Sequence, residues 1–318
     1  MPGASTGGKS SGCGCGQPGR TVTSVRVGVV GPGYIGARHI EAWRRLGVTL
    51  HGYTRSAARR AEVAAAFPEV TWHRELGTLL DAVEVVDVCT PTDSHAPLVL
   101  RAAAAGRHVV CEKPMARTLD EASAMLAGCA DAGVQLHVGH LVRYVDGYAA
   151  AHEAVRAGEV GRLLTLRLYR GTAVPSWADW FADPGRSGGV LLDLGIHDID
   201  YARWVAGDVV RVEAAMVEPG VGRAVLTHEG GAVSEVTAAW GPSGTPFRTE
   251  FEIVGTDGRL DHDSTADRAG PAGDPLAAML QEFRDAIRGG PPPRVTVDDA
   301  VAALRIALTA AEVCEPAR

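Results

Sequence analysis

The stretch of residues 25–39, VRVGVVGPGYIGARH, constrains the fold of this chain more than any other feature. Its four valines form a short β-branched run that is typical of a buried parallel strand. Gly31, Gly33 and Gly36 follow at G-x-G-x-x-G spacing. Between a strand and a helix, the first glycine permits the tight turn and the second lets the backbone approach a pyrophosphate. The third lets the helix pack closely on the strand.

The helix after these glycines completes a predicted phosphate site. It begins at Tyr34 and Ile35, where free backbone N–H groups and the positive end of the helix dipole would face the phosphates. Spaced glycines alone would also suit an ordinary strand–turn–helix corner, but here they open a series of alternating strands and helices. We therefore predict a dinucleotide site formed by Gly31, Gly33, Tyr34, Ile35 and Gly36.

Length and composition favour a two-domain enzyme with a small-molecule substrate. A chain of 318 residues corresponds to about two domains at ~150 residues each. The net charge of -7 argues against nucleic acid or an anionic membrane as a partner. No apolar run reaches the ~18 residues of a membrane span, and the first residues lack the apolar segment of a signal peptide. Six scattered cysteines suit reduced thiols, so we expect a cytoplasmic protein.

Residues 1–22 are rich in Gly, Ser and Pro, which predicts a disordered tail. Residues 3–10, GASTGGKS, match the phosphate-binding Walker A pattern, but no strand precedes them and no helix follows, so we interpret the match as chance. Cys13 and Cys15 are more typical of inert thiols than of metal ligands, and we expect no metal site.

Alternating strands and helices predict a parallel, doubly wound sheet over residues 23–141. The second strand, residues 48–53, ends without the Asp or Glu that usually binds the ribose 2′-OH of NAD. Thr54, Arg55 and Ser56 stand there instead. A guanidinium and two hydroxyls suit a 2′-phosphate, so we expect NADP to be preferred, with NAD possible as cofactor. Arg59 and Arg60 follow closely, and the alternative is that these arginines are solvated charges on a helix face.

A later strand, residues 109–111, ends in Glu112-Lys113-Pro114. Ligands bind at the carboxyl ends of the strands in a doubly wound sheet. Lys113 is therefore placed to reach both cofactor and substrate, on a backbone that the proline restricts.

Residues 142–318 predict a second α/β domain. Strand-like runs at 163–169, 209–217, 224–228 with 232–240, and 249–254 indicate an open, largely antiparallel sheet. Residues 255–271 resemble turn and loop. Helices are expected over 190–205, 275–288 and 297–313, and a loop with Trp177, Trp180 and Phe181 precedes the first of them.

The helix from Val190 carries a candidate catalytic face. Asp193, His197 and Asp200 lie at i, i+4 and i+7. An i, i+4 pair has Cβ atoms ~5–6 Å apart, so Asp193 would reach the His197 ring or share its substrate contacts. A histidine oriented by a carboxylate suits a general base. An amphipathic helix with satisfied polar residues is the alternative, but it does not explain Gly195 inside the helix at a cost of ~1 kcal/mol.

The residues GPGYIG at 31–36, EKP at 112–114 and GG-x-x-x-D-x-G-x-H-x-x-D at 188–200 resemble the Gfo/Idh/MocA oxidoreductases, from about residue 24 to the C-terminus. The resemblance implies a Rossmann domain and an α/β domain whose open sheet forms homodimers or homotetramers. It also implies that the last helix returns to the Rossmann domain. The implied reaction is hydride transfer between NAD or NADP and a carbinol or keto carbon of a sugar, cyclitol or related polyol.

The same resemblance implies roles for single residues. Lys113 would bind and polarise the reacting oxygen, His197 would carry its proton, and Asp193 would contact substrate or orient His197. The nicotinamide ribose would be lined by Thr90, Pro91 and Glu112. His95, which opens the helix after Thr90 and Pro91, is a further cofactor-binding candidate. An alternative function is a glycoside hydrolase that uses a tightly held NAD for transient oxidation; a non-catalytic cofactor-binding protein would not explain the lysine, aspartate and histidine together.

Overall fold

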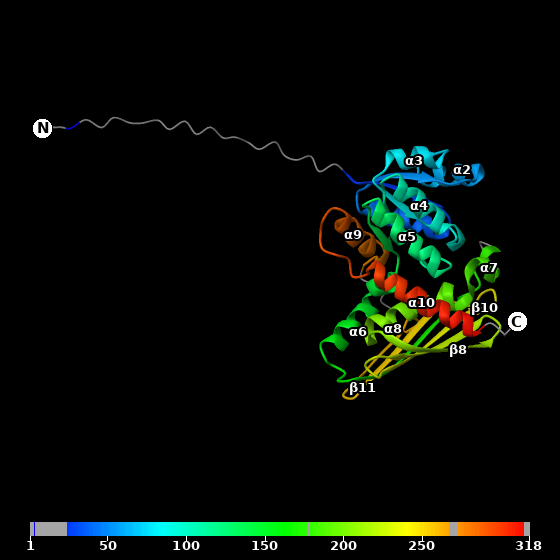
Figure 1. Ribbon diagram of the computed structural model, residues 1–318, viewed down its shortest axis with the longest axis vertical. Helices are drawn as coiled ribbons and strands as arrows, with labels where there is room; N and C mark the ends of the chain where they lie inside the picture. The colour runs from blue at the N-terminus through cyan, green and yellow to red at the C-terminus, as the bar shows by residue number, and fades with distance from the viewer. Residues whose placement is uncertain (1–2, 4–23, 177–178, 267–272, 315–318) are drawn as a thin grey trace.

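The computed structural model describes all residues except 1–2, 4–23, 177–178, 267–272 and 315–318. Most of the predicted tail and of the Walker-like match, with Cys13, Cys15 and Trp177, therefore lies outside the described residues. Two sheets organise the described chain (Figure 1).

The first sheet has six parallel strands in the order β3-β2-β1-β4-β5-β6. The strands are β1 (Arg26–Val30), β2 (Thr49–Tyr53), β3 (Thr71–His73), β4 (Val85–Val88), β5 (His108–Cys111) and β6 (Leu136–Val138). The accompanying helices are α1 (Tyr34–Arg45), α2 (Ala57–Ala66), α3 (Leu76–Ala82), α4 (His95–Ala104) and α5 (Leu119–Asp131). The predicted doubly wound sheet is confirmed. Its strand order reverses between β1 and β4, which is where such sheets bind ligands.

Burial explains why the valine-rich segments form central strands. Val27 and Val29 of β1 are fully buried, as are Ile40 and Trp43 on the inner face of α1. Helix α9 (Pro275–Ile287) adds Phe283 to the same apolar core. The chain thus returns from its C-terminal part to cover the first sheet.

Two helices from the C-terminal part of the chain contact the first domain. The last helix, α10 (Val297–Cys314), packs along α8 (Ile196–Ala206) and the edge strand of the second sheet, and touches α5 and β6 of the first domain (Figure 1). It is α9 that packs against α1. Both C-terminal helices therefore contact the first domain, α9 through α1 and α10 through α5 and β6.

The second sheet has the order β12-β11-β7-β10-β9-β8, and only β7 and β10 pair in parallel. Its strands are β7 (Leu163–Ala173), β8 (Val209–Glu218), β9 (Val221–His228), β10 (Val233–Gly241), β11 (Arg248–Gly255) and β12 (Arg259–Asp263). The prediction of a largely antiparallel sheet is confirmed, but β12 was expected as loop. Its sequence RLDHD has one apolar residue, so hydrophobic alternation is nearly absent.

Helices cover one face of this sheet. Helices α6 (Asp146–Arg156), α8 and α10 lie between it and the first domain, and no described helix covers the opposite face (Figure 1). Two cross-strand ion pairs, Arg167–Glu252 and Arg223–Glu235, involve partly exposed side chains of this sheet. Among the described helices, none is long and apolar enough to span a bilayer.

The helix predicted over 190–205 is divided in two. Leu191–Gly195 is a π-helical turn, and α8 begins only at Ile196. Gly188 and Gly189 precede it with φ values of +82° and +80°, which favour glycine. A π turn holds more residues than an α turn and is frequent at functional sites.

Candidate functional site

The three glycines after β1 have distinct structural roles. Gly31 has φ +88°, and a Cβ there would lie 2.6 Å from Thr90 Cγ2. A Cβ at Gly36 would overlap the carbonyl oxygen of Gly31. At Gly33, however, a Cβ would meet no described atom within 4 Å. The fold therefore requires Gly31 and Gly36, whereas Gly33 leaves open space at the N-terminus of α1, where the sequence predicts the pyrophosphate.

The end of β2 presents one unpaired cation. Ser56 Oγ accepts a hydrogen bond from the backbone N–H of Arg59 at 3.1 Å and caps α2, and Thr54 Oγ1 accepts one from Ser56 N at 3.4 Å. Both hydroxyls thus support the local backbone. Arg55 is exposed and makes no ion pair or hydrogen bond with any described residue.

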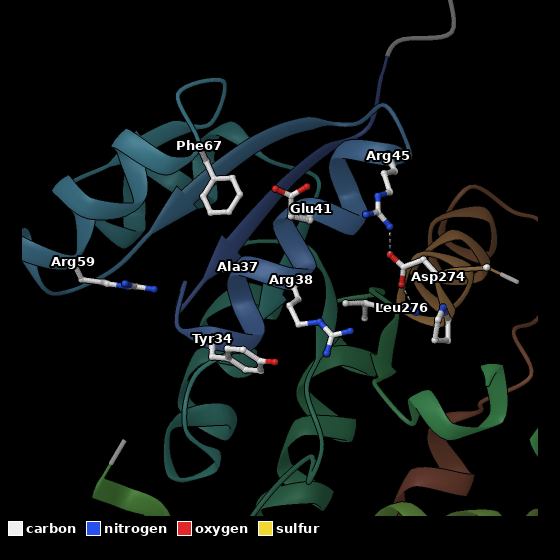
Figure 2. Close-up of a pocket in the computed structure, with 11 residues that line it drawn as sticks. Tyr34, Ala37, Arg38, Glu41, Arg45, Arg59, Phe67, Asp274 and Leu276 are labelled. Atoms are coloured by element: carbon white, nitrogen blue, oxygen red, sulfur yellow. Dashed lines mark hydrogen bonds and ion pairs between the residues drawn. The ribbon is translucent and has the colours of Figure 1, made fainter. Parts of the chain in front are cut away.

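Sequence reasoning assigned no specific role to Arg59 beside the glycine loop. Its Nε donates to the carbonyl oxygen of Pro32 at 3.0 Å, and its guanidinium pairs with Glu62. Figure 2 shows Arg59 with Tyr34 at one end of a cavity of about 660 Å³ along the outer side of α1. At the other end, Arg45 pairs with Asp274, next to the first residue of α9. The cavity is open and lies beside the predicted phosphate site.

Lys113 reaches across from the first domain to the π turn. Its ammonium donates to the backbone carbonyl oxygen of Asp193 at 2.8 Å and lies 3.7 Å from the Asp193 carboxylate. Burial raises the pKa of Asp193, and the neighbouring Lys113 charge lowers it by a smaller amount, so the pKa stays above its usual range. The structure thus brings together Lys113 and Asp193, which are 80 residues apart in sequence.

His197 follows the π turn and feels the Lys113 charge, but it is not oriented by Asp193. Its Nδ1 is buried and has no hydrogen-bond partner among the described residues. Burial first, and then the positive charges of Lys113 and Arg170, hold the pKa of His197 well below 6.5. Of the two predicted roles of Asp193, orienting His197 is therefore not seen in the described structure, and contacting substrate stays a prediction. Because the π turn separates the two residues, they do not stack as an α-helical i, i+4 pair, and the Asp193 carboxylate faces Lys113.

Two buried ion pairs hold α8 in place around His197. Arg170 on β7 makes two hydrogen bonds to Asp198, at 2.8 and 2.9 Å. Arg143 makes two to Asp200, at 2.9 and 2.6 Å. Bidentate pairs of this kind fix geometry as well as charge. Asp200 therefore braces the helix.

His140, at the end of β6, is a further site residue that the motifs did not indicate. Its ring is 1% exposed, and neither ring nitrogen has a hydrogen-bond partner among the described residues. The nearest carboxylate oxygen, on Asp200, lies 3.9 Å from Nδ1. Burial, partly offset by Asp200, lowers the pKa of His140, so the ring is neutral near pH 7.

A cluster of charged groups lies inside the first domain next to Glu112. His39 on α1 places Nδ1 2.8 Å from Asp87 Oδ2 and Nε2 3.0 Å from Glu112 Oε1. Trp43 also donates to Asp87, at 2.7 Å. Asp87 in an otherwise apolar buried strand was a sequence signal for this cluster, because a buried carboxylate must be paired.

The cluster is the one described group with metal-type geometry. Ligand atoms of His39, Asp87 and Cys89 lie within 4.8 Å of one another. Burial and the nearby Asp87 charge raise the pKa of the Cys89 thiol far above its usual range, which keeps it protonated. The Asp87 oxygens already accept hydrogen bonds from His39, Trp43 and Cys89. These contacts fit a hydrogen-bonded cluster better than a cation site.

His95 supports the Lys113 turn rather than offering a cofactor contact. Its ring nitrogens lie 2.9 Å from the carbonyl oxygen of Pro114 and 2.8 Å from that of Thr90. Because the ring is buried and both nitrogens face backbone oxygens, we reassign it from the cofactor set to the support of this turn. Thr90, Pro91 and Glu112 remain at the carboxyl ends of β4 and β5.

Comparison with known proteins agrees with this architecture. Residues 25–140 match the oxidoreductase family with an NAD-binding Rossmann fold, and residues 148–261 match the GFO/IDH/MocA C-terminal domain. A D-apiose dehydrogenase from Paraburkholderia graminis is 32% identical over 76% of this chain and 68% of its own length. The myo-inositol 2-dehydrogenase of Thermotoga maritima is 27% identical over 92% of this chain and 97% of its own length.

A solved structure supports the fold independently. GenD2 from gentamicin A biosynthesis, in complex with NAD, superimposes with a TM-score of 0.83 at 24% identity, over 94% of this chain and 96% of its own. Both halves of the described chain, the order of their motifs and these similarities lead to one assignment. The chain belongs to the Gfo/Idh/MocA oxidoreductase family and carries that family's NAD-binding Rossmann domain.

Proposed function

We propose that this protein is a dehydrogenase or reductase that transfers hydride between a nicotinamide dinucleotide and a carbinol or keto carbon of a sugar, cyclitol or related polyol. The observation that carries the proposal is the meeting of Lys113 with the π turn before His197, at the carboxyl end of the parallel sheet. Relatives named as apiose and inositol dehydrogenases support the substrate class.

In this reaction, cofactor binding, stabilisation of the substrate oxygen and proton transfer fall to different residues. When bound, the dinucleotide supplies a hydride acceptor or donor; Gly33 and the N-terminus of α1 would hold its phosphates. The Lys113 ammonium donates a hydrogen bond to the substrate oxygen and so favours a developing alkoxide. In the oxidation direction, the neutral imidazole of His197 accepts the hydroxyl proton; in reduction, it returns that proton to the oxygen.

Asp193 keeps Lys113 in place. Its carbonyl oxygen accepts one of the three ammonium N–H bonds, which leaves the others for the substrate. The buried aspartate side chain also offers an oxygen to a substrate hydroxyl. A polyol is a good match for such a site, because several hydroxyls can pair with several polar groups at once.

NADP is the proposed preferred cofactor, with NAD also used. No carboxylate stands among residues 54–56, and Arg55 is exposed and unpaired within the described chain. A charge-assisted hydrogen bond to a 2′-phosphate contributes ~1.5–3 kcal/mol, which corresponds to roughly ten- to a hundredfold in affinity. We expect Arg55→Ala to lose most of that preference. The control Arg101→Ala, which removes another exposed arginine, should keep it.

We also propose that the protein forms a homodimer or homotetramer through the face of the second sheet that no described helix covers. Light scattering coupled to size-exclusion chromatography tests this: a monomer at micromolar concentration would contradict it. A cytoplasmic location is proposed with it, supported by the free thiols Cys89, Cys111 and Cys129, which suit a reducing compartment.

The decisive experiment is a substrate screen with both cofactors. Cyclitols, aldoses, ketoses and their polyols are incubated with NAD or NADP, and nicotinamide absorbance reports net turnover. Lys113→Ala provides the background rate. Net reduction of cofactor by a cyclitol or sugar supports the proposal. Cleavage of a glycoside without net cofactor turnover would instead identify the hydrolase alternative.

A further inference from the structure

Three buried charged groups lie next to the strand end that carries Lys113. The His39 ring nitrogens face Asp87 at 2.8 Å and Glu112 at 3.0 Å, and the side chains of these three residues are 1%, 0% and 16% exposed. An imidazolium has two N–H donors and so satisfies both carboxylates at once. Neutral histidine would leave one of these contacts without a proton.

The directions of the shifts agree with this charge state. Burial alone would lower the pKa of His39, but Asp87 outweighs it and the pKa rises well above 6.5. Burial would raise the pKa of Glu112, and its hydrogen bond from His39 lowers it overall. The group is therefore carboxylate, imidazolium and carboxylate.

Stability alone does not account for such a group. Taking charges out of water costs several kcal/mol per ion, and apolar residues of similar volume are often as stable or more so. The group is, however, hydrogen-bonded to Lys113: the second carboxylate oxygen of Glu112 accepts a hydrogen bond from the Lys113 backbone N–H at 3.2 Å. On the other side, a Cβ at Gly139 would lie 3.0 Å from Glu112 Oε1, so a side chain at position 139 would press on this carboxylate.

We propose that His39 is a positioning residue for Lys113. Its imidazolium, anchored by Asp87, fixes the Glu112 carboxylate, and Glu112 in turn fixes the backbone from which the Lys113 ammonium reaches Asp193. His39 belongs to α1, whose N-terminus borders the predicted phosphate site, so one helix sets the position of both the cofactor and the lysine. This inference rests on the proposed function, which assigns Lys113 to the reacting oxygen.

The chain offers a direct probe of Lys113 that does not require turnover. Its only lysines are Lys9 and Lys113. In full-length protein with Lys9→Arg, a lysine labelled with ¹³C at Cε gives a single NMR signal from position 113. We expect this signal to differ from that of free lysine and to move toward it in His39→Gln.

A matched variant controls for the loss of any buried histidine. His137 on β6 is 7% exposed, stacks on Phe283 and bonds to Gln135, and it shares no hydrogen bond with the described residues of the cluster. His137→Gln should leave the Lys113 signal and kcat unchanged. In His39→Gln, kcat should fall by about tenfold or more, the scale that misplacement of a reacting group produces. The substrate KM and the Kd for NADH should change far less, because binding groups are retained.

A charge-balanced double variant separates positioning from general loosening. In His39→Gln the two carboxylates face each other without a cation, whereas His39→Gln with Glu112→Gln removes one of them and restores amide hydrogen bonding. The double variant should therefore regain part of the lost kcat, and its Lys113 signal should move back toward the wild-type position. Independent, additive losses would overturn the proposal.

The outcomes distinguish this inference from the proposed function. If the wild-type protein turns over but His39→Gln changes neither the Lys113 signal nor kcat, the positioning role is wrong. An equal change in His137→Gln would also overturn it. If no polyol is oxidised, the proposed function fails, while the NMR signal still decides the role of His39. Should His39→Gln not fold, Glu112→Gln alone provides the same test, because it preserves the Asp87–His39 pair.

Discussion

The glycine loop and the start of α8 serve one site, but they are built from different groups. The loop offers exposed backbone: a Cβ added at Gly33 would meet no described atom within 4 Å, its chain neighbours aside. The start of α8 offers buried side chains held by ion pairs, with Arg170 on Asp198 and Arg143 on Asp200. A backbone site can bind any phosphate of the right shape, whereas the paired side chains give one arrangement for proton transfer.

The two regions should therefore respond differently to substitution. A side chain added to the loop should block the cofactor without disturbing the fold. Removal of a side chain at α8 should leave the cofactor bound but stop the chemistry.

Gly33→Val should abolish dinucleotide binding. The added side chain occupies the open space at the N-terminus of α1. Its Cβ would meet no described atom within 4 Å, its chain neighbours aside, so the thermal melting temperature should stay near that of wild type. Titration calorimetry with NAD and NADP measures the effect. Gly77→Val is the matched control, because a Cβ at Gly77 on α3 also meets nothing described within 4 Å. Undiminished affinity in Gly33→Val would refute the assignment of the loop.

His197→Ala and Lys113→Ala should each lower kcat by at least about a hundredfold, the lower end of what general acid–base help contributes. Cofactor affinity should remain nearly constant, in contrast to Gly33→Val. The measurement is steady-state turnover on the substrate found in the screen, under conditions where hydride transfer limits the rate. A variant that keeps most of its turnover there would remove that residue from the chemistry.

The pH profile should show where His197 titrates. Its pKa lies well below 6.5, so the neutral base is present at neutral pH, and kcat/KM for oxidation should fall only as the pH drops below that ordinary value. For reduction, which needs the protonated ring, the rate should rise over the same range. Burial raises the pKa of Asp193 above 3.8, so protonation of this carboxylate also contributes to the pH profile on its acidic side. Asp193→Asn separates the two groups: the fall of kcat/KM at acidic pH persists in this variant if it belongs to His197.

The sequence predicted the loop better than the region around α8, for a physical reason. Gly31, Gly33 and Gly36 act through local backbone geometry, so their spacing identifies them. His197 depends on partners far along the chain: Arg170 is 28 residues from Asp198, and Arg143 is 57 from Asp200. The π turn likewise follows from tertiary packing, because helical periodicity alone predicts an α turn that would stack Asp193 on His197.

The His39 cluster shows the same limit. His39 lies in the first stretch that predicts the fold, and Asp87 stands conspicuously inside an apolar strand. Their pairing across 48 residues is set by how α1 packs on β4, which no local pattern specifies. Residues that position others are therefore harder to find from sequence than residues that contact a ligand.

The smallest expected effect concerns the segment before β1. Deletion of residues 1–20 should change neither cofactor affinity nor kcat, because the phosphate site is already provided by Gly33 and α1. The Walker-like GASTGGKS at 3–10 lacks the preceding strand and following helix that a phosphate cradle needs. Lys9→Ala in the full chain tests this match most narrowly, since a true Walker lysine contacts the phosphates directly. Calorimetry with NAD, NADP and ATP should give the wild-type values for both variants. A loss of dinucleotide affinity in Lys9→Ala, or an ATP signal that vanishes with it, would show that a second phosphate site exists outside the Rossmann domain.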